Sequence, residues 1–467
     1  MKSLLKYLKD YKKETVLAPF FKMLEALFEL FVPLVMAAII DTGIAGNDKP
    51  YIFQMSGILI ALGLIGLVCS ITAQYFSAKA ACGCAAKLKN ALFEKMQAMT
   101  FTEMDHVGAS TMINRMTTDV NQVQTGINMV LRLFLRSPFI VFGAMIMAFT
   151  VNAKAALVFV VVIPVLSVIV FGIMLVTIPL YKNVQGQLDN VLEKTRENLA
   201  GIRVIRAFGK EEEEIREFEA RNNALTRFQQ YVGKISALMN PVTYVVINIA
   251  IAVLIYVGAI QVNVGILTQG AVVALYNYMS QILVELIKLA NLIITMTKSA
   301  ASAQRIETIF KVSKGKKEIE ILPEGNTEAK VVFDHVTLAY ENAGENTLTD
   351  IDFIVNSGDT IGIIGGTGSG KTSLVHLIPG FYPVKQGAVY VDGKNVKSYE
   401  EGELRDKIGI VMQKSVLFKG TIRENMLWGN ENATDEEIIQ AIETAQGKDI
   451  LEKKENGLDE EIEQGGR

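Results

Sequence analysis

The sequence is poor in cysteine and has no excess of positive charge, and each shortage excludes a class of protein. Its three cysteines, Cys69, Cys82 and Cys84, lie in or just after one apolar segment. They form neither a secreted disulfide framework nor a four-ligand metal set. The net charge is −3 over 467 residues, whereas a nucleic-acid-binding domain is expected to have a basic face. We therefore expect no nucleic-acid partner.

What the sequence has in abundance is apolar residues. They make up 50% of the chain, and the mean hydropathy is +0.30. This content is too high for an ordinary pair of soluble domains and is typical of a membrane protein that also has a soluble domain. Residues 1–13 are basic, but the stretch that follows is long, carries acids and has no small-residue cleavage site. A cleaved signal peptide is therefore not expected.

Six apolar stretches are long enough to cross roughly 30 Å of hydrocarbon as helices. They lie near residues 16–40, 52–78, 133–151, 156–180, 240–261 and 269–296. Lysine and arginine are concentrated in residues 1–15, 79–132 and 181–239. The short connections that join the predicted spans on the other side hold almost none. Because positive segments stay inside, the N-terminus, both long connections and the C-terminal domain are predicted to be cytoplasmic. The chain is then a multi-pass protein of the cytoplasmic membrane.

The inner connection 181–234 is predicted to be helix and not loop. Apolar or small residues recur at three- and four-residue steps, with charges between them and no proline: Leu188, Leu192, Thr195, Leu199 and Ile202. About 25 helical residues would project roughly 40 Å beyond the headgroups. At the turnaround, Gly201–Phe208 combines apolar and basic residues in one short element, which could dock into a groove on a soluble domain.

The pattern changes after residue 296. Residues 299–330 are predicted to be a polar linker, and Val331–Tyr340 is predicted to be a strand of a separate α/β domain. The expected fold is thus an all-α transmembrane domain of six helices over 1–298, with long cytoplasmic helical extensions. It is followed by the linker and by part of an α/β nucleotide-binding domain over 331–467.

A phosphate-binding loop is the most specific motif. The pattern G-x-x-x-x-G-K-[ST] is filled by Gly365, Gly366, Thr367, Gly368, Ser369, Gly370, Lys371 and Thr372. The apolar run Thr360–Ile364 before it is predicted to be a buried strand. The run Thr372–Ile378 after it is predicted to be a short helix that stops at Pro379. Strand, glycine loop and helix are the context in which this motif binds a nucleoside triphosphate.

With these spans, basic connections and phosphate loop in this order, the chain resembles half of an ABC exporter along essentially its whole length. In the membrane half, Arg115–Val120 and Gly201–Phe208 are similar to the family's two inner-connection motifs. In the soluble half, Ile408–Gln413 resembles the Q-loop and Leu417–Asn425 the segment after it. The resemblance is to bacterial half-transporters that pair with a non-identical partner in multidrug-type exporters, so a heterodimer is expected over a homodimer.

The resemblance implies a role for individual residues and implies ATP and Mg²⁺ as ligands. Lys371 would contact the β- and γ-phosphates, and the hydroxyl of Thr372 would hold Mg²⁺, with Ser373 as a weaker phosphate contact. Tyr340 matches the aromatic residue that stacks on adenine. Gln413 matches the glutamine that reports the γ-phosphate and Mg²⁺ to the membrane half.

Ionisable groups inside the predicted spans are costly and are by default functional candidates. Glu25 and Glu29 lie one helical turn apart in the first span, and the last span is unusually polar. A cavity for a small or amphiphilic substrate is predicted, with the candidates Glu25, Glu29, Tyr276, Gln281 and Glu285. Pairing between helices without any ligand is the equal alternative. Glu25 and Glu29 favour a cationic substrate.

The sequence ends at Arg467, where the resemblance places the approach to the signature motif. No counterpart of the Walker B strand, its catalytic Glu or the switch His is found, and no catalytic residue is predicted. We therefore expect a C-terminally truncated form of an ATP-driven exporter subunit, which binds ATP phosphates without hydrolysing ATP alone. The alternative is a catalytically inactive regulatory half of a heterodimeric transporter.

Overall fold

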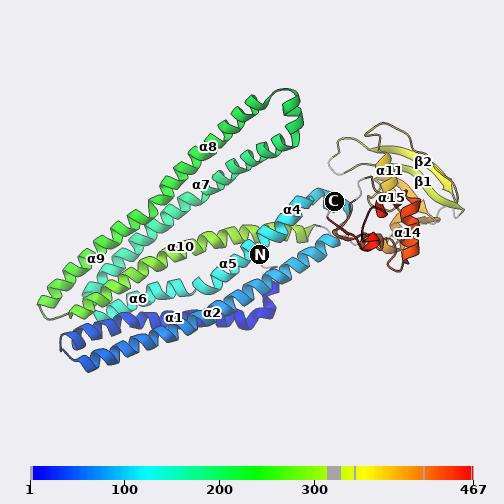
Figure 1. Cartoon of the computed structure of the whole chain (residues 1–467). Helices are drawn as coiled ribbons and strands as arrows, with labels where there is room; N and C mark the ends of the chain where they lie inside the picture. Colours follow the sequence, from blue (N-terminus) through cyan, green and yellow to red (C-terminus); the bar gives the residue numbers. More distant parts are fainter. Residues whose placement is uncertain (1–3, 313–327, 341–342, 414–415, 464, 466–467) are drawn as a thin grey trace. The chain divides into compact units, whose positions relative to one another are not determined.

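The computed structural model describes residues 4–312, 328–340, 343–413, 416–463 and 465 (Figure 1). They divide into two compact units, Met1–Lys316 and Lys317–Arg467. The first unit is built from long helices, and the second is a small domain that contains strands. This is the predicted fold class.

In the first unit, the described residues include six helices that are long and apolar enough to cross a membrane. These are Lys6–Ile44, Lys49–Gln97, Ala109–Val151, Ala153–Ala207, Glu211–Asn263 and Gln269–Lys311. Each predicted apolar stretch falls inside one of them. A helix pairs its backbone N–H and C=O groups within itself, which is why it can form in hydrocarbon without a neighbour.

Several of these helices are built from consecutive elements (Figure 1). In chain order the elements are η1 (Leu4–Tyr11), α1 (Lys12–Ala38), η2 (Ile39–Ile44), α2 (Lys49–Gln97), α3 (Phe101–Val107), α4 (Ala109–Asn114), η3 (Arg115–Asp119), α5 (Val120–Leu133), α6 (Arg136–Val151), α7 (Ala153–Ala207), α8 (Glu211–Ala237), α9 (Met239–Asn263) and α10 (Gln269–Lys311). Here η1 is a 3₁₀ helix, and η2 and η3 are π-helical.

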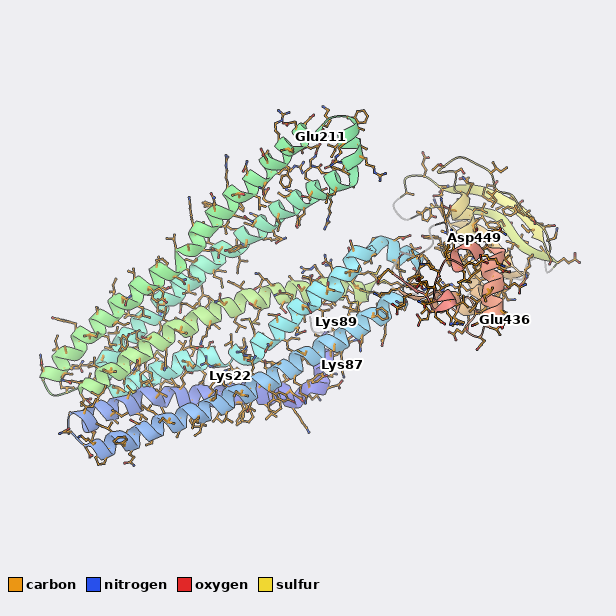
Figure 2. All side chains as sticks on the ribbon, in the orientation of Figure 1. Lys22, Lys87, Lys89, Glu211, Glu436 and Asp449 are labelled. Carbon is orange, nitrogen blue, oxygen red and sulfur yellow. The ribbon has the colours of Figure 1, made fainter. Side chains whose placement is uncertain are left out.

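The connection predicted to be helical forms the hairpin of α7 and α8. Its turn lies slightly later than predicted, because Gly201–Ala207 is the end of α7 and the chain reverses at Phe208–Lys210. Gly209 adopts φ 60° there, a left-handed conformation that a glycine takes without strain. Figure 2 shows the charged Glu211 at the tip of this hairpin, at the end remote from α9.

The core of the membrane unit is formed mainly by α10 and the helices around it. Phe159, Leu166, Leu254, Tyr278 and Ile282 are fully buried in one cluster. The Tyr278 hydroxyl donates to the carbonyl oxygen of Leu30 at 2.7 Å. An aromatic residue with a polar tip is thereby buried without an unpaired donor.

The predicted linker is partly wrong, because α10 does not stop at residue 298 but continues to Lys311. The last turns of α10 bury Ala303, Ile306 and Ile309 in a second cluster with Leu88 and Val120. Serines and alanines made 299–311 look like linker, but the apolar residues between them pack against other helices. Residues 313–327 of the predicted linker lie outside the described residues, and its last two residues, Ala329 and Lys330, belong to strand β1 (Ala329–Leu338).

In the second unit, four strands form an antiparallel sheet in the order β2-β1-β3-β4. Its strands are β1 (Ala329–Leu338), β2 (Leu348–Asn356), β3 (Gln386–Val391) and β4 (Lys394–Asn395). The other elements are α11 (Lys371–Leu377), η4 (Val396–Ser398), α12 (Glu401–Arg405), β5 (Gly420–Thr421), α13 (Ile422–Met426), α14 (Asp435–Thr444), α15 (Lys448–Leu451), η5 (Gly457–Asp459) and β6 (Glu461–Ile462). Phe333, Leu348, Leu377 and Val389 share one core, which packs α11 against the sheet.

The strand predicted over Thr360–Ile364 is absent from the described part of the unit. Residues 360–366 are irregular, and Ile364 is 99% exposed. Residues 408–412 are irregular as well, and Val411 is 95% exposed. A strand forms only where a second strand offers an edge, and β1 to β4 pair among themselves. An apolar run therefore indicates a strand only when its partner is also in place.

Candidate functional site

The phosphate-binding loop leads directly into α11, as predicted. Gly368 and Gly370 adopt φ 83° and 84°, and Gly370 is the N-cap residue directly before the first residue of the helix. A Cβ at Gly370 would lie 2.7 Å from Cδ2 of Leu348 and 3.1 Å from the carbonyl oxygen of Thr347. Glycine is needed here both for the backbone conformation and for the close approach of β2.

The Lys371 ammonium folds back over the loop. Its Nζ donates to the carbonyl oxygens of Gly365 at 2.7 Å and Gly366 at 2.6 Å, and to Oγ of Ser369 at 3.3 Å. A Cβ at Gly365 would lie 2.7 Å from that Oγ. The two ends of the loop, at Gly365 and Ser369, are therefore too close for a side chain at position 365. The loop thus surrounds an ammonium group that can exchange carbonyl oxygens for phosphate oxygens, which are stronger acceptors.

Tyr340 and Ser373 are brought together. The Tyr340 hydroxyl donates to Oγ of Ser373 at 2.9 Å. The Tyr340 ring meets Tyr382 edge-on, with centroids 4.9 Å apart. Ser373 is buried, so its hydroxyl joins the residues just after β1 to α11. This contact favours a structural role for Ser373 over the predicted phosphate contact.

The other predicted nucleotide residues lie on the surface. Thr372 is exposed at the start of α11, and Gln413 is exposed in a bend next to residues 414–415, which lie outside the described residues. Thr367 is also exposed. Their predicted contacts with the nucleotide and with Mg²⁺ remain predictions.

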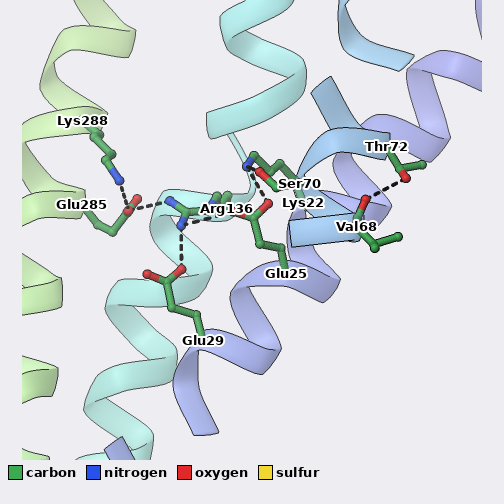
Figure 3. A network of polar contacts seen from close by, with 9 residues as sticks. All are labelled: Lys22, Glu25, Glu29, Val68, Ser70, Thr72, Arg136, Glu285 and Lys288. Atoms are coloured by element: carbon green, nitrogen blue, oxygen red, sulfur yellow. Dashed lines mark hydrogen bonds and ion pairs between the residues drawn. The ribbon is translucent and has the colours of Figure 1, made fainter. Parts of the chain in front are cut away.

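In the membrane unit, a buried arginine joins three helices (Figure 3). Arg136, at the start of α6, places Nη2 2.6 Å from Oε2 of Glu29 on α1 and Nη1 2.5 Å from Oε1 of Glu285 on α10. Glu285 also accepts from the Ser137 hydroxyl at 2.8 Å and from the Lys288 ammonium at 2.8 Å. The Arg136 and Glu285 side chains are only 7% and 3% exposed, so each buried charge has partners, as burial requires.

Glu25 belongs to the same network but has a second partner. Its Oε2 accepts from Nζ of Lys22 at 2.5 Å, and Lys22 also donates to Oγ of Ser70 on α2 at 3.0 Å. Arg136 Nη2 lies 3.9 Å from Oε1 of Glu25. Pairing between helices, one of the two predicted alternatives, is therefore present.

A cavity of about 480 Å³, the other alternative, lies beside this network. Its lining residues come from α1 and α10: Glu29, Val32, Pro33, Met36, Asn277, Ser280, Gln281, Val284, Glu285 and Lys288. Three predicted cavity residues, Glu29, Gln281 and Glu285, line it. Glu25 and Tyr276 are not among its lining residues: Glu25 bonds to Lys22, and Tyr276 is exposed while the adjacent Leu275 is buried.

Arg136 and Lys22 are the residues that sequence reasoning missed. Both lie inside or at the edge of predicted spans, so the rule that selected Glu25 and Glu29 would have selected them as well. With Lys288 they supply three positive charges beside three carboxylates. The predicted preference for a cationic substrate therefore loses its electrostatic basis, because it counted only the acids.

The inner-connection motif Arg115–Val120 also contains a buried charge. The Asp119 carboxylate is buried and accepts from Nη1 of Arg115 at 2.9 Å and from Nε of Arg305 at 3.1 Å. Arg305 also donates to Oγ of Ser302 at 2.8 Å. The motif therefore joins η3 to the last turns of α10, which extends the helical packing well past the predicted spans.

Both halves of the chain match known families. Residues 15–286 match the family model of the ABC transporter transmembrane region, and residues 348–463 match a second family model described as ABC transporter. The chain is 30% identical over 466 residues to the ABC transporter ATP-binding protein YfiB of Bacillus subtilis, with 100% of this chain and 81% of that protein covered. It is 29% identical to an ABC transporter ATP-binding protein of Mycobacterium tuberculosis, covering 98% of this chain and 80% of that protein.

A more distant relative has a named activity. The ATP-dependent lipid A-core flippase of Yersinia pestis is 24% identical over 461 residues, which cover 98% of this chain and 78% of the flippase. The order of the two matched regions is the one the sequence predicted. The chain belongs to the ABC transporter family, as a half-transporter of the exporter type that joins a multi-pass membrane region to an ATP-binding domain.

Proposed function

We propose that this chain is the ATP-binding subunit of an exporter that moves a small or amphiphilic substrate out across the cytoplasmic membrane. The single observation that carries this proposal is the phosphate loop, which winds around the Lys371 ammonium with two left-handed glycines beside it. Such a loop offers backbone N–H groups and one ammonium to the phosphates. The relative named ATP-dependent lipid A-core flippase supports ATP-dependent movement of an amphiphilic substrate.

The residues fit ATP with Mg²⁺. Lys371 would bind the phosphates, Tyr340 would stack on adenine, and Thr372 and Gln413 would hold the metal ion. When bound, Mg²⁺ neutralises part of the phosphate charge. We assign nucleotide binding to this sequence but no hydrolytic residue, because it contains no counterpart of the family's Walker B Glu or switch His.

We further propose that a second half-transporter, non-identical to this chain, completes the complex. ATP binding would bring the two soluble domains together, and the α7–α8 hairpin and the α3–α4 turn would carry that motion into the membrane. ATP shifts the equilibrium only by its different affinity for the two states. The basic inner connections support a cytoplasmic N-terminus and a cytoplasmic soluble domain, because positive segments stay inside.

The test is Lys371→Ala in the chain assembled with its partner. We expect binding of a fluorescent ATP analogue to fall by about tenfold or more, since charge-assisted hydrogen bonds are each worth about 1.5–3 kcal/mol. ATP-dependent export in membrane vesicles should be lost, with membrane insertion unchanged. Lys394→Ala is the matched control, because Lys394, on β4, is bound to Glu403 of α12 and not to the loop. Undiminished ATP-dependent export by Lys371→Ala would overturn the proposal.

A further inference from the structure

The cavity between α1 and α10 has one charged end and one uncharged end. On α1, Glu29 is followed by Val32, Pro33 and Met36, which extend about 10 Å along the helix at 1.5 Å per residue. On α10, the lining residues recur at three- and four-residue steps and so share one face of the helix: Asn277, Ser280, Gln281, Val284, Glu285 and Lys288. The charged residues of both helices lie at the Glu29 end of α1 and the Lys288 end of α10.

The charges at that end are of two kinds. Arg136 and Glu285 are buried and form an ion pair with each other. The Glu29 and Lys288 side chains are 40% and 42% exposed. One oxygen of Glu29 accepts from Arg136, and Lys288 uses one of its three donors on Glu285. A ligand therefore meets one carboxylate and one ammonium group, which lie on the two helices in Figure 3.

We propose that this cavity recognises a zwitterionic amphiphile. Its amine would contact Glu29, its phosphate or carboxylate would contact Lys288, and its apolar chain would lie along Val32, Pro33 and Met36. The inference rests on the proposed function, because it takes this cavity as part of the transport path and specifies the class of substrate.

Charge balance is the physical reason for this class. The network holds three cationic and three anionic side chains, Lys22, Arg136, Lys288, Glu25, Glu29 and Glu285. A ligand with one net charge would leave that charge uncompensated in a site of low dielectric, which is costly. A zwitterion brings both signs and leaves the balance unchanged. The site would thus discriminate against singly charged analogues.

The experiment compares three short-chain probes with similar tails: dihexanoyl phosphatidylethanolamine, dihexanoyl phosphatidylmethanol, whose phosphodiester carries one negative charge, and dihexyldimethylammonium. Each is titrated without nucleotide onto the purified full chain in a nonionic detergent, and bound ligand is counted by native mass spectrometry. We expect the zwitterion to bind about tenfold or more tightly than either singly charged probe, as one charge-assisted hydrogen bond would provide. Equal binding of all three probes would overturn the proposal.

Two variants identify the groups responsible. Lys288→Gln leaves the buried Arg136–Glu285 pair in place and should lower zwitterion affinity about tenfold while the cationic probe is retained. Lys288→Arg should keep the preference. Glu29→Gln should lower zwitterion affinity and retain the anionic probe. Lys298→Gln, at an exposed position of α10 outside the lining, is the control and should change nothing.

An unchanged preference in Lys288→Gln would show that the zwitterion is bound elsewhere and would overturn the assignment. The outcome is distinguishable from failure of the proposed function. Probe binding is measured without ATP, so a missing preference removes the ligand class and leaves ATP-dependent export testable through Lys371. Absence of ATP-dependent export by the unmodified complex would contradict the exporter proposal, independently of the probe-binding result.

Discussion

The two units of the chain differ in how far their structure depends on distant residues. In the membrane unit, each long helix pairs its backbone within itself, and the predicted apolar stretches all became helix. In the second unit, a strand needs a partner, and the apolar run at 360–364 did not become one. Apolar patterning is therefore a sufficient guide to structure in the first unit and an insufficient one in the second.

The side-chain contacts show the opposite dependence. Arg136 pairs with Glu29 and Glu285, which are 107 and 149 residues away. Lys371 bonds to Gly365 and Gly366, which are six and five residues away. The nucleotide loop is thus a local structure that a short motif can encode, whereas the membrane charge network exists only once α1, α6 and α10 have packed.

Removing the Arg136 guanidinium gives the largest expected effect on stability. Arg136→Met leaves Glu285 and Glu29 without their shared cation, and breaking a buried pair costs about 3–5 kcal/mol of unfolding free energy. The measurement is unfolding of the purified full chain in mixed micelles by increasing SDS. The double variant Arg136→Met with Glu285→Met should recover much of the loss, because it leaves no unpaired charge at Glu285.

The double variant could instead lose as much unfolding free energy as Arg136→Met and Glu285→Met lose together. That result would contradict the contrast between a membrane unit held by distant charge pairs and a second unit with a local loop. It would mean that the two residues act independently, since additive effects are typical of residues that do not interact. The network would then not depend on contacts between residues that are distant in the chain.

Substituting Gly370 gives an intermediate effect that is confined to the second unit. Gly370→Ala introduces a side chain at φ 84° and brings Cβ against Leu348, which should cost about 1–3 kcal/mol. Binding of a fluorescent ATP analogue and thermal unfolding of the full chain are the measurements. Both should be impaired.

Substitutions of two neighbouring glycines separate the effect of backbone strain from the effect of the Cβ contact. Gly368→Ala adds the strain of φ 83° but meets nothing within 4 Å, and Gly366→Ala adds neither. The expected order of damage is Gly370, then Gly368, then Gly366. If Gly366→Ala is as harmful as Gly370→Ala, the loop does not owe its form to local backbone conformation.

The smallest expected effect is on the pH dependence of the second unit. Hydrogen bonds from the ammonium groups of Lys330 and then Lys407 lower the pKa of Asp392 below its usual value of 3.8. A carboxylate whose pKa is lowered on folding stabilises the fold above the unfolded pKa, and this contribution is lost as pH falls through the folded pKa. Asp392→Asn should therefore cost about 0.5–1 kcal/mol at neutral pH and nothing below the folded pKa.

Thermal unfolding followed from pH 7 downward measures this difference. Asn tolerates the φ of 50° at this turn, so the variant removes charge without adding strain. Glu403→Gln, which loses one exposed partner, Lys394, is the control and should show a weaker dependence. A constant difference between Asp392→Asn and the unmodified chain at every pH would contradict the linkage.

Local regularities were predicted from the sequence. Helical spacing and the absence of proline predicted the α7–α8 hairpin, and the pattern from Gly365 to Thr372 predicted a loop that enters a helix. The prediction failed where burial by distant residues decided the outcome. Ala303, Ile306 and Ile309 lie where α10 continues into the supposed linker as far as Lys311, and α2 and α5 cover them. The contact of Ser373 with Tyr340 was likewise not evident from the sequence, and the predicted phosphate contact of Ser373 stays a prediction.

The amino-acid sequence by itself determined the membrane helices, their order and the phosphate loop, because these depend on hydrogen bonds and backbone conformations that are close in the chain. Tertiary structure alone decided which charges are paired and which are accessible. Arg136 is neutralised by carboxylates on two other helices, and Glu29 and Lys288 line one cavity, only after the helices have packed. Electrostatic energy depends on distance and burial, and neither is encoded in the spacing of residues along a single helix.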